Sequence, residues 1–462
     1  MQITSYGAAE TVTGSCHLLE ANGQRILIDC GLYQGNRELE EKNQPPLPFD
    51  ASTLDLVLIT HGHLDHVGRL PLLIKGGYRG KFHCTPATRA VTELILRDAA
   101  HIAEEDFDRD LRKARRQGRE HEVPEPLYTE KDIDLLMQRI TPDMGWENTL
   151  HFHGIEIRFY PAGHVLGSAW IEVFAEGKTV VISGDLGNRE SPVEADFHLP
   201  GPCDAVVIES TYGNRAHRSQ QDTVDEFAQV LQQSIKKDGK ILIPSFALER
   251  TQNILYVLRQ LQDEGRIPLT PIYLDSPMGS RITRLYENLG GDFNPDVQQD
   301  LEQGDRPFAP ENLFVTSSSG ESRRLNDMKG AAIILAGSGM LSGGRIVHHL
   351  KHHLWKDSTS LVIVGYQSPN SLGGRLIAGA DRVRIHGEEV VVRASVHTIG
   401  GFSAHADQDD LLAFLEPTEH ARVHLVHGDL QVMEAFQQEL ESRGRQVVIN
   451  RFGETYTVGQ NL

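Results

Sequence analysis

Short runs of apolar and β-branched residues dominate the first 210 residues of the chain, and turn-forming residues separate them. Runs of this length and composition predict β-strands. The clearest predicted strands are residues 26–31, 54–60, 155–160, 179–185 and 205–210. One long helix interrupts them: Thr85 precedes Pro86 at the first helical position, and apolar residues follow at helical spacing. A second helix is predicted from Thr129, which forms a variant capping box with Asp132.

From about residue 220 to residue 385 the pattern changes to strands that alternate with helices. The predicted strands here are residues 241–245, 271–275, 313–316, 331–337 and 361–365. Such alternation predicts a mostly parallel sheet covered by helices. The last stretch again shows the pattern of the first 210 residues, with the run VVVRASVHTI, a predicted helix near residues 406–416 and the run RVHLVHG.

Length and charge limit the classes of protein to consider. The chain has 462 residues, which suits about two or three domains at ~100–200 residues each. Its net charge of -19 argues against a protein that coats nucleic acid non-specifically, but not against a deep site that holds phosphate through metal ions. The stretch RDLRKARRQGR, residues 109–119, is the main basic segment of this acidic chain. A solvated helix face is a simpler interpretation of it than a contact with nucleic acid.

Neither membrane insertion nor export is indicated by the sequence. No apolar run approaches the ~20 residues that a membrane helix needs. The start of the chain, MQITSYGAAE, lacks the basic and apolar parts of a signal peptide. We therefore expect a cytoplasmic protein without a membrane partner.

The segment ITHGHLDHVG, residues 59–68, concentrates metal-ligand residue types behind an apolar strand. His61 and His63 follow the strand with a spacing of two, so their rings point the same way. Asp65 and His66 lie at the turn into a helix and face a second point nearby. This arrangement supplies ligands to two adjacent metal ions, which hydrolytic sites hold about 3.5–4 Å apart. Histidine nitrogen and carboxylate oxygen suit Zn²⁺, and Mn²⁺ or Fe²⁺ would also be accepted.

Further ligand candidates recur where other apolar runs end. They are His164 in FYPAGHVLGS, Asp185 in VISGDLG and His427 in VHLVHGD. Each is flanked by glycine, which lets the backbone approach a ligand closely. Each alone would more often be an ordinary loop residue, but together they complete a ligand set.

HGHLDH resembles the HxHxDH signature of the metallo-β-lactamase superfamily, and Asp29, His164 and Asp185 match its other motifs. The resemblance implies an α/β fold, a four-layer αββα sandwich with the metals at one edge of its two sheets. The implied ligands are His61, His63 and His164 for one ion, and Asp65, His66 and His427 for the other. Asp185 would bridge the ions, and Asp29 would support the ligands from outside.

Three more features resemble the β-CASP subgroup, the nucleases that include the pre-mRNA 3′-end processing endonuclease. Glu209 in VVIESTYGNR, His405 in FSAHAD and His427 in LVHGD match its three motifs in order. The resemblance covers essentially the whole chain. It implies a metallo-β-lactamase domain in two parts, residues 1–210 and 389–462, with an inserted α/β β-CASP domain over residues 211–388. Histidine in the third motif goes with members that act on RNA, so His427 favours RNA.

A mechanism follows from the placement of charge. Two cations lower the pKa of a bridging water, which gives hydroxide near neutral pH for in-line attack on phosphorus. His405, oriented by Glu209, is suited to protonate the leaving oxygen, while Asp65 and Asp185 act through the metals. We expect a di-zinc ribonuclease that takes single-stranded RNA in a cleft between two domains. The sequence does not decide between endonucleolytic and exonucleolytic cleavage. It also leaves open whether the protein forms a homodimer.

Weaker candidates lie in and near the inserted domain. Arg250 in PSFALERTQ, Ser338 in AGSGMLSGGR and Ser403 could each contact phosphate, but turn chemistry or a helix cap explains each of them equally well. In HHLKHHLW, residues 348–355, histidines recur at metal-capable spacing. The apolar stripe of this segment favours exposed histidines instead.

Two other functions stay open at this point. A small-molecule ester or lactam hydrolase would use the same metal site, but it leaves the insert and the Glu209 and His405 motifs unexplained. A non-catalytic RNA-binding subunit is the second alternative. Inactive paralogues of the subgroup have usually lost metal ligands, and here none is missing.

Overall fold

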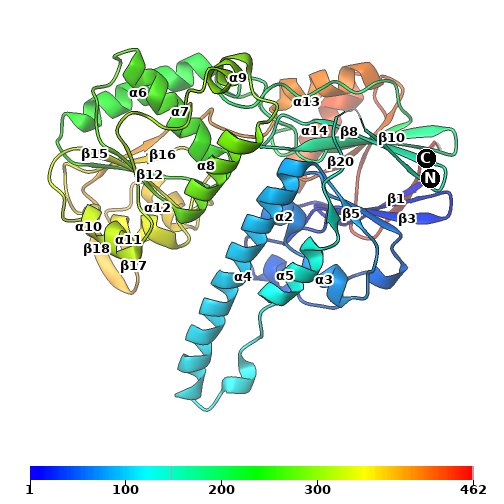
Figure 1. Cartoon of the computed structure of the whole chain (residues 1–462), viewed down its shortest axis with the longest axis horizontal. Coiled ribbons are helices and arrows are strands. Elements are labelled where there is room, and N and C mark those ends of the chain that lie inside the picture. Colours follow the sequence, from blue (N-terminus) through cyan, green and yellow to red (C-terminus); the bar gives the residue numbers. More distant parts are fainter. Residues whose placement is uncertain (147, 460–462) are drawn as a thin grey trace. The chain divides into compact units, whose positions relative to one another are not determined.

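The computed structural model describes residues 1–146 and 148–459 (Figure 1). The chain divides into two compact units. The first comprises Met1–Arg189, Asp196–Ala216 and His405–Leu462, and the second comprises Glu190–Ala195 and His217–Ala404. Among the described helices, none combines the length and the apolar composition needed to cross a membrane.

Two seven-stranded sheets form the centre of the first unit, as far as the chain is described. One sheet has, in spatial order, β22 (Thr455–Thr457), β1 (Gln2–Gly7), β2 (Cys16–Ala21), β3 (Gln24–Ile28), β4 (Leu56–Leu58), β5 (Phe82–His83) and β6 (Ile140–Thr141). The other has β21 (Val447–Ile449), β20 (Arg422–Val426), β11 (Ala205–Glu209), β10 (Lys178–Ile182), β9 (Ala169–Ala175), β8 (Ile155–Pro161) and β7 (Thr149–Phe152). The five strands predicted in this part of the chain are all present.

Alternation along the strands separates three apolar cores. On β3, Ile26 and Ile28 contribute to the core that the two sheets share, whereas Leu27 faces the helices on the outer side. On β11, Val207 faces the shared core, and Val206 contributes to the core on the opposite side. Successive side chains point to opposite faces of a strand, so each sheet buries apolar residues on both faces. The result is the predicted αββα sandwich.

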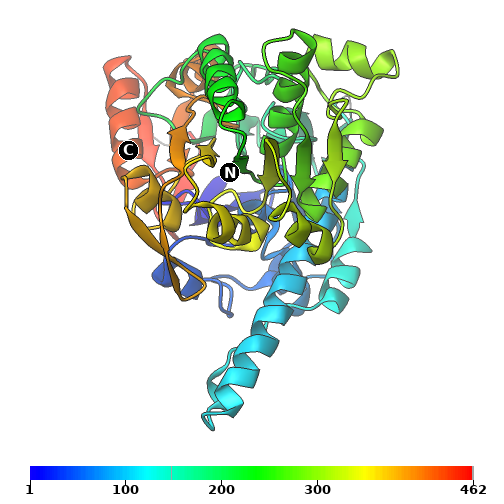
Figure 2. The same ribbon diagram turned by 90° about the vertical axis from the view of Figure 1, so that its left-hand side faces the viewer.

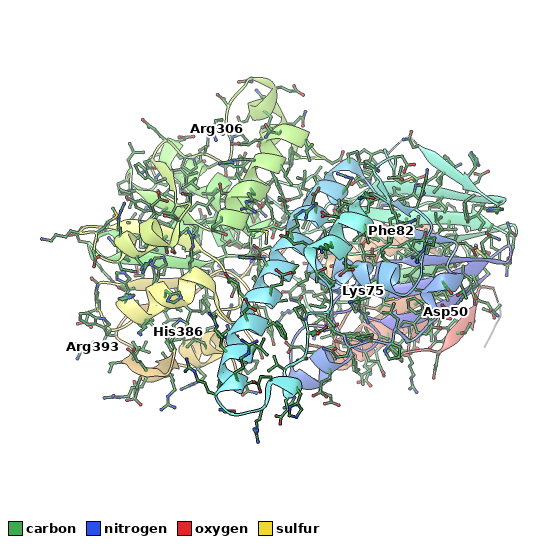
Figure 3. The ribbon with its side chains drawn as sticks, turned by 60° about the horizontal axis from the view of Figure 1, so that its bottom comes forward. Asp50, Lys75, Phe82, Arg306, His386 and Arg393 are labelled. Carbon is green, nitrogen blue, oxygen red and sulfur yellow. The ribbon has the colours of Figure 1, made fainter. Side chains whose placement is uncertain are left out.

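Helices cover the outer face of each sheet. Over the first sheet lie α3 (Leu70–Lys75), α4 (Pro86–Arg115) and α5 (Glu130–Met137), and over the second lie α13 (Gln408–Leu415) and α14 (Leu430–Ser442). The shorter helices α1 (Arg37–Glu41) and α2 (Leu64–Val67) belong to the same unit. Phe82, labelled with Lys75 in Figure 3, contributes to the core under α3, α4 and α5.

Both helix starts predicted in this unit are confirmed. Thr85 Oγ1 accepts a hydrogen bond from the Thr88 N–H at 3.1 Å and caps α4. The carboxylate of Asp132 accepts a hydrogen bond from the Thr129 N–H at 2.8 Å, and a capping box opens α5. Figure 2 shows α4 extending from this start away from the sheets of the first unit.

The second unit is built on a parallel sheet, as predicted from its alternating pattern. Its described strands lie in the order β14 (Leu313–Val315), β13 (Ile272–Asp275), β15 (Ala332–Ala336), β12 (Lys240–Pro244), β16 (Ser360–Ile363) and β19 (Ser395–Thr398). Its helices are α6 (Gln220–Ile235), α7 (Arg250–Asp263), α8 (Pro277–Leu289), α9 (Pro295–Glu302), α10 (Ser319–Leu325), α11 (Gly344–His353) and α12 (Leu372–Ile377). Two apolar cores, one on each face of the sheet, join these helices to the strands.

Residues 389–404 lie in the second unit, whereas the family resemblance implied that residues 389–462 belong to the first domain. The run VVVRASVHTI is not one strand. Its start belongs to β18 (Glu388–Val391), which pairs with β17 (Arg382–Ile385), and its end forms β19. Because β19 pairs with β16 in parallel, it completes the edge of the second unit's sheet, and the first unit resumes at His405.

The expectation of exposed histidines on α11 is wrong for two of the four. His348 and His352 are exposed, and the His348 ring stacks on His386, which Figure 3 labels. His349 and His353 are buried.

The buried carboxylate of Asp275 accounts for the burial of His349. His349 Nε2 lies 2.6 Å from Asp275 Oδ2, and its Nδ1 lies 2.9 Å from Asn326 Oδ1. The same carboxylate accepts hydrogen bonds from Ser322 and Arg345, each at 2.6 Å. Burial alone would raise the pKa of Asp275, but these donors, His349 first, hold it at about 2. Polar groups with full sets of partners are tolerated in a core.

Candidate metal centre

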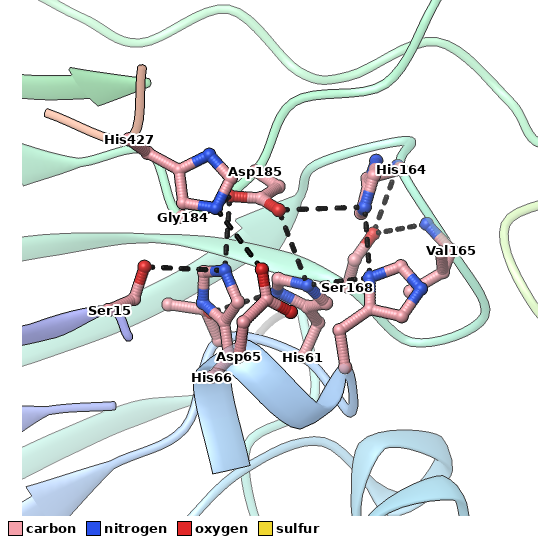
Figure 4. Close-up of polar contacts among 12 residues, drawn as sticks. Ser15, His61, Asp65, His66, His164, Val165, Ser168, Gly184, Asp185 and His427 are labelled. Carbon is pink, nitrogen blue, oxygen red and sulfur yellow. Dashed lines mark hydrogen bonds and ion pairs between the residues drawn. The ribbon is translucent and has the colours of Figure 1, made fainter. Parts of the chain in front are cut away.

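The ends of several strands in the first unit bring the predicted ligands together. His61 and His63 follow β4, and His63 precedes the first residue of α2, which carries Asp65 and His66. The other three come from segments distant in the sequence: His164 from the loop between β8 and β9, Asp185 from the loop after β10, and His427 from the residue after β20. Figure 4 shows these side chains converging from their separate segments.

One group of four ligand atoms surrounds the first point. His63 Nδ1 lies 3.1 Å from His61 Nε2 and 3.2 Å from His164 Nε2. Asp185 Oδ2 lies 3.6 Å from His61 Nε2 and 3.7 Å from His164 Nε2. All four atoms lie within 4.8 Å of one another, so this group could hold a metal ion.

A second group lies on the other side of the Asp185 carboxylate. His427 Nε2 lies 3.5 Å from Asp65 Oδ2, and Asp65, His66 and His427 form the group. Asp185 Oδ1 lies 3.2 Å from His66 Nε2 and 3.6 Å from His427 Nε2. Thus Oδ2 of Asp185 faces the first group and Oδ1 faces the second.

The polar atoms at this centre fit metal ions. Asp185 Oδ1 and His427 Nε2 are buried and have no hydrogen-bond partner among the residues the structure describes, and buried polar atoms of this kind need an explanation such as an ion. Burial lowers the pKa of His61 well below its ordinary value and that of His63 to about 4. Both imidazoles are therefore neutral near pH 7, which is the form that binds metal.

Asp29 lies behind the second group and contacts one of its rings. Its Oδ2 lies 2.7 Å from His66 Nδ1, so Nε2 of the same ring is directed at Asp185. Asp29 also accepts hydrogen bonds from the Thr60 backbone N–H at 2.8 Å and from the Thr60 hydroxyl at 2.7 Å. The carboxylate thereby fixes the orientation of a ligand ring and the backbone beside His61.

His405 and Glu209 lie side by side next to the first group. Glu209 is fully buried at the end of β11, and its two carboxylate oxygens lie 3.1 and 3.2 Å from His405 Nδ1. The Leu186 N–H donates to Glu209 at 2.7 Å. Burial alone would lower the pKa of His405, but the charge of Glu209 and its hydrogen bond raise it to about 10. The pair thus presents a protonated imidazole 4.0 Å from Asp185.

Two hydroxyl residues that the sequence did not single out also organise the centre. The Ser168 hydroxyl accepts hydrogen bonds from the His164 N–H at 3.0 Å and the Val165 N–H at 3.1 Å, which fixes the loop of that ligand (Figure 4). Thr211 donates to Glu209 at 2.6 Å and lies 3.1 Å from His427 Nδ1. Thr211 stands two residues after Glu209, and that spacing is the one signal that could have pointed to it.

The three weaker candidates belong to the second unit. Arg250 is buried at the start of α7, where its guanidinium donates to the Val364 carbonyl. Ser338 lies in the glycine-rich turn before α11, with its hydroxyl 3.2 Å from that of Ser342. Ser403 is half-buried. Their contact with substrate stays a prediction.

Three family models match the chain. The "Metallo-beta-lactamase superfamily" model matches residues 10–245, and the "Beta-Casp domain" model matches residues 251–376. The model described as "Zn-dependent metallo-hydrolase RNA specificity domain" matches residues 389–450. The chain is also 45% identical over 454 residues to ribonuclease TTHA0252 of Thermus thermophilus, which spans 98% of this chain and 99% of that protein. The chain belongs to the β-CASP ribonucleases of the metallo-β-lactamase superfamily.

Other similarities agree with membership of the β-CASP family. Transcription termination factor FttA of Methanocaldococcus jannaschii is 31% identical over 447 residues, covering 93% of this chain and 67% of that factor. A crystal structure of a protein of unknown function from Enterococcus faecalis V583 matches with a TM-score of 0.55 at 11% identity, over 98% and 99% of the two chains. That likeness supports the fold alone. The family resemblance expected from the motifs is confirmed.

Proposed function

We propose that this β-CASP nuclease hydrolyses phosphodiester bonds of single-stranded RNA. It uses two divalent cations for this reaction, and Zn²⁺ is the metal we propose for both positions. The observation that carries the proposal is the Asp185 carboxylate: its two oxygens face two separate ligand groups, beside the His405–Glu209 pair. A site for one metal would not need a carboxylate placed between two sets of imidazoles.

Seven residues would hold the two ions. They are His61, His63 and His164 for one ion, Asp65, His66 and His427 for the other, and Asp185 for both. When bound, the ions supply a water that ionises near neutral pH and neutralise charge on the phosphodiester. Asp29 and Thr60 keep the ligand side chains in place.

His405 would protonate the leaving oxygen. Its Nδ1 faces Glu209, so Nε2 is the nitrogen turned toward substrate. Because the carboxylate raises the pKa of the imidazole, the proton is present at neutral pH and available for transfer. Glu209 acts through His405 as a positioning residue.

RNA is the substrate class favoured by the similarities and by the third motif. One relative is named a ribonuclease and another a transcription termination factor, and the match over residues 389–450 is to a domain described by RNA specificity. A small-molecule hydrolase would have no use for a buried carboxylate that holds a protonated histidine beside the metal ligands.

Cleavage of a 5′-labelled single-stranded RNA by the zinc-loaded protein tests this proposal. The matched substrates are DNA of the same sequence, the same RNA in a duplex, and a chromogenic ester and β-lactam. We expect the single-stranded RNA to be cut at least about 100-fold faster than the others, with two metals per chain by atomic emission. Hydrolysis of the ester or lactam without RNA cleavage would instead establish the small-molecule alternative.

The alkaline limb of the pH profile is expected to depend on Glu209. His405 donates only while it is protonated, so kcat/KM falls as pH rises through the pKa that Glu209 raises. The substitution Glu209→Gln removes the charge but keeps an oxygen acceptor, so it should move the limb to lower pH by at least about one unit. Activity measured from neutral pH to about one unit above the pKa of His405 gives the position of the limb in both proteins.

Thr211→Val is the control for this pH experiment. It removes a hydrogen bond to the same carboxylate but leaves the negative charge, so the limb should stay in place. If Glu209→Gln also leaves the limb in place, His405 is not the group that titrates there.

A further inference from the structure

The distal end of α4 and the turn after it carry a separated block of positive charge. Residues 111–119, LRKARRQGR, contain five arginine or lysine residues and no carboxylate. The seven residues before them, EEDFDRD, contain five carboxylates and one arginine. We call residues 111–119 the basic arm. A block of one sign is unusual in a chain whose net charge is -19, and it marks a surface suited to an anionic partner.

Packing within the fold does not account for the basic arm. The buried residues of α4 all lie between Ala87 and Ala100, and its second half has none. Figures 1 and 2 both show this half projecting beyond the other elements of the first unit. Cations in a last helical turn complement the helix dipole, but Arg116 and Arg119 lie beyond the last helical residue, Arg115.

The charges of the arm are also largely uncompensated. Lys113, Arg115 and Arg116 are exposed, and none of them forms an ion pair with a carboxylate in the described part of the chain. Arg119 has one such partner, Glu122, at 3.6 Å. Three side chains therefore present free positive charge to a partner.

The other end of α4 is fixed beside the metal centre. Thr85 and Thr88 each donate a hydrogen bond to the Gly167 carbonyl at 2.8 Å, three residues after the ligand His164. A 30-residue helix is about 45 Å long. The helix thus connects the ligand loop to the basic arm as a single rigid element. A nucleic-acid strand that rises about 3.4 Å per nucleotide covers the length of this helix with roughly 13 nucleotides.

We propose that the basic arm binds the phosphate backbone of the substrate RNA at a distance of about a dozen nucleotides from the bond that is cut. This inference rests on the proposed ribonuclease function. Lysine and arginine side chains hold phosphates without reading bases. The acidic residues 104–110 between the arm and the centre repel phosphate, so the strand makes contact at the two ends of the helix. RNA is favoured over an acidic protein as the partner of the basic arm, because α4 begins beside the metal centre, where the backbone of the substrate RNA must lie.

Binding of labelled RNA tests the arm without relying on cleavage. The full chain carrying His405→Ala and loaded with zinc is titrated against single-stranded RNAs of 8 and 40 nucleotides, with and without Lys113→Gln, Arg115→Gln and Arg116→Gln together. For the 40-nucleotide RNA we expect the triple substitution to weaken binding at least about tenfold at low salt. Three lost phosphate contacts should reduce the slope of log K against log salt by about 2. Binding of the 8-nucleotide RNA should not change.

A matched triple variant controls for net charge. Arg37→Gln, Arg443→Gln and Arg451→Gln remove the same charge from exposed positions elsewhere in the first unit, and should leave the long RNA bound as before. Unchanged affinity of the arm variant for the long RNA, or an equal loss in the control, overturns the proposal and leaves the arm as a site for an acidic protein or a solvated helix end. Glutamine is a good helix former, so the variant should fold, and its melting temperature verifies this.

Cleavage rates separate the failure of the arm from the failure of the proposed function. In the protein with His405 intact, the arm variant should cut the 8-nucleotide RNA at the normal rate and lose kcat/KM only on the 40-nucleotide RNA, through KM. If the protein cuts neither RNA, the proposed function fails, and the binding titration still decides whether the arm holds the long strand.

Discussion

Replacing Asp185 with asparagine is expected to abolish RNA cleavage and to release metal from the protein. Each oxygen of this carboxylate faces a different ligand group, and an amide offers one oxygen, no charge and an N–H₂ group that repels a cation. Loss of several kcal/mol of charge stabilisation corresponds to a fall in kcat/KM of about 10³–10⁴-fold.

Metal content read by atomic emission is the measurement that tests Asp185 independently of activity. Asp185→Asn should retain fewer than two metals per chain after dialysis. Asp196→Asn is the matched control, because this exposed carboxylate of the same unit pairs with Arg189, and it should retain both metals and full activity. A protein with Asp185→Asn that keeps two metals and normal turnover would show that the carboxylate does not join the two groups.

Replacing His405 with alanine is expected to lower kcat by about 10²–10⁴-fold while both metals stay bound. His405 could itself be counted as a ligand, because it forms a third group with Asp185 and His427. Its Nδ1 lies closer to Glu209, at 3.1 Å, than to Asp185, at 4.0 Å. We therefore expect a proton donor, and a donor can be removed without loss of metal.

A substrate with a different leaving group distinguishes these two roles of His405. If the leaving oxygen is replaced by sulfur, the departing thiolate needs no proton, so the variant should cut this RNA at close to the wild-type rate. His198→Ala, at an exposed histidine of the same unit, should leave both substrates unaffected. Loss of one metal from His405→Ala, together with equal loss on both substrates, would make His405 a ligand.

Much of this centre could be predicted because strand ends and ligands are adjacent in the sequence. Short apolar and β-branched runs identified the strands, including β11, where Val206 and Val207 enter different cores. A polar residue within about three residues of the end of such a strand lies at the sheet edge, which is where Asp185 and His427 are found. The motif order then identified the family.

Features that depend on distant partners could not be predicted. The burial of His349 rests on Asp275, 74 residues away in the sequence, and nothing near the histidine indicates that carboxylate. The run ending in β19 has the composition of any half-buried strand, so its pairing with β16 could not be assigned. Ser168 is one of many turn hydroxyls, and only its two hydrogen bonds distinguish it.

The order in which the ligands occur along the chain has a consequence for synthesis on the ribosome. The first strand, β1, pairs with β22 near the other end of the described chain. His427 follows His66 by about 360 residues, which a ribosome adds in roughly 20–70 s. The second metal group is thus incomplete throughout that interval, while the second unit is already emerging. The messenger RNA of this protein is itself a potential substrate, and the protein lacks a complete ligand set until almost all of that RNA has been translated.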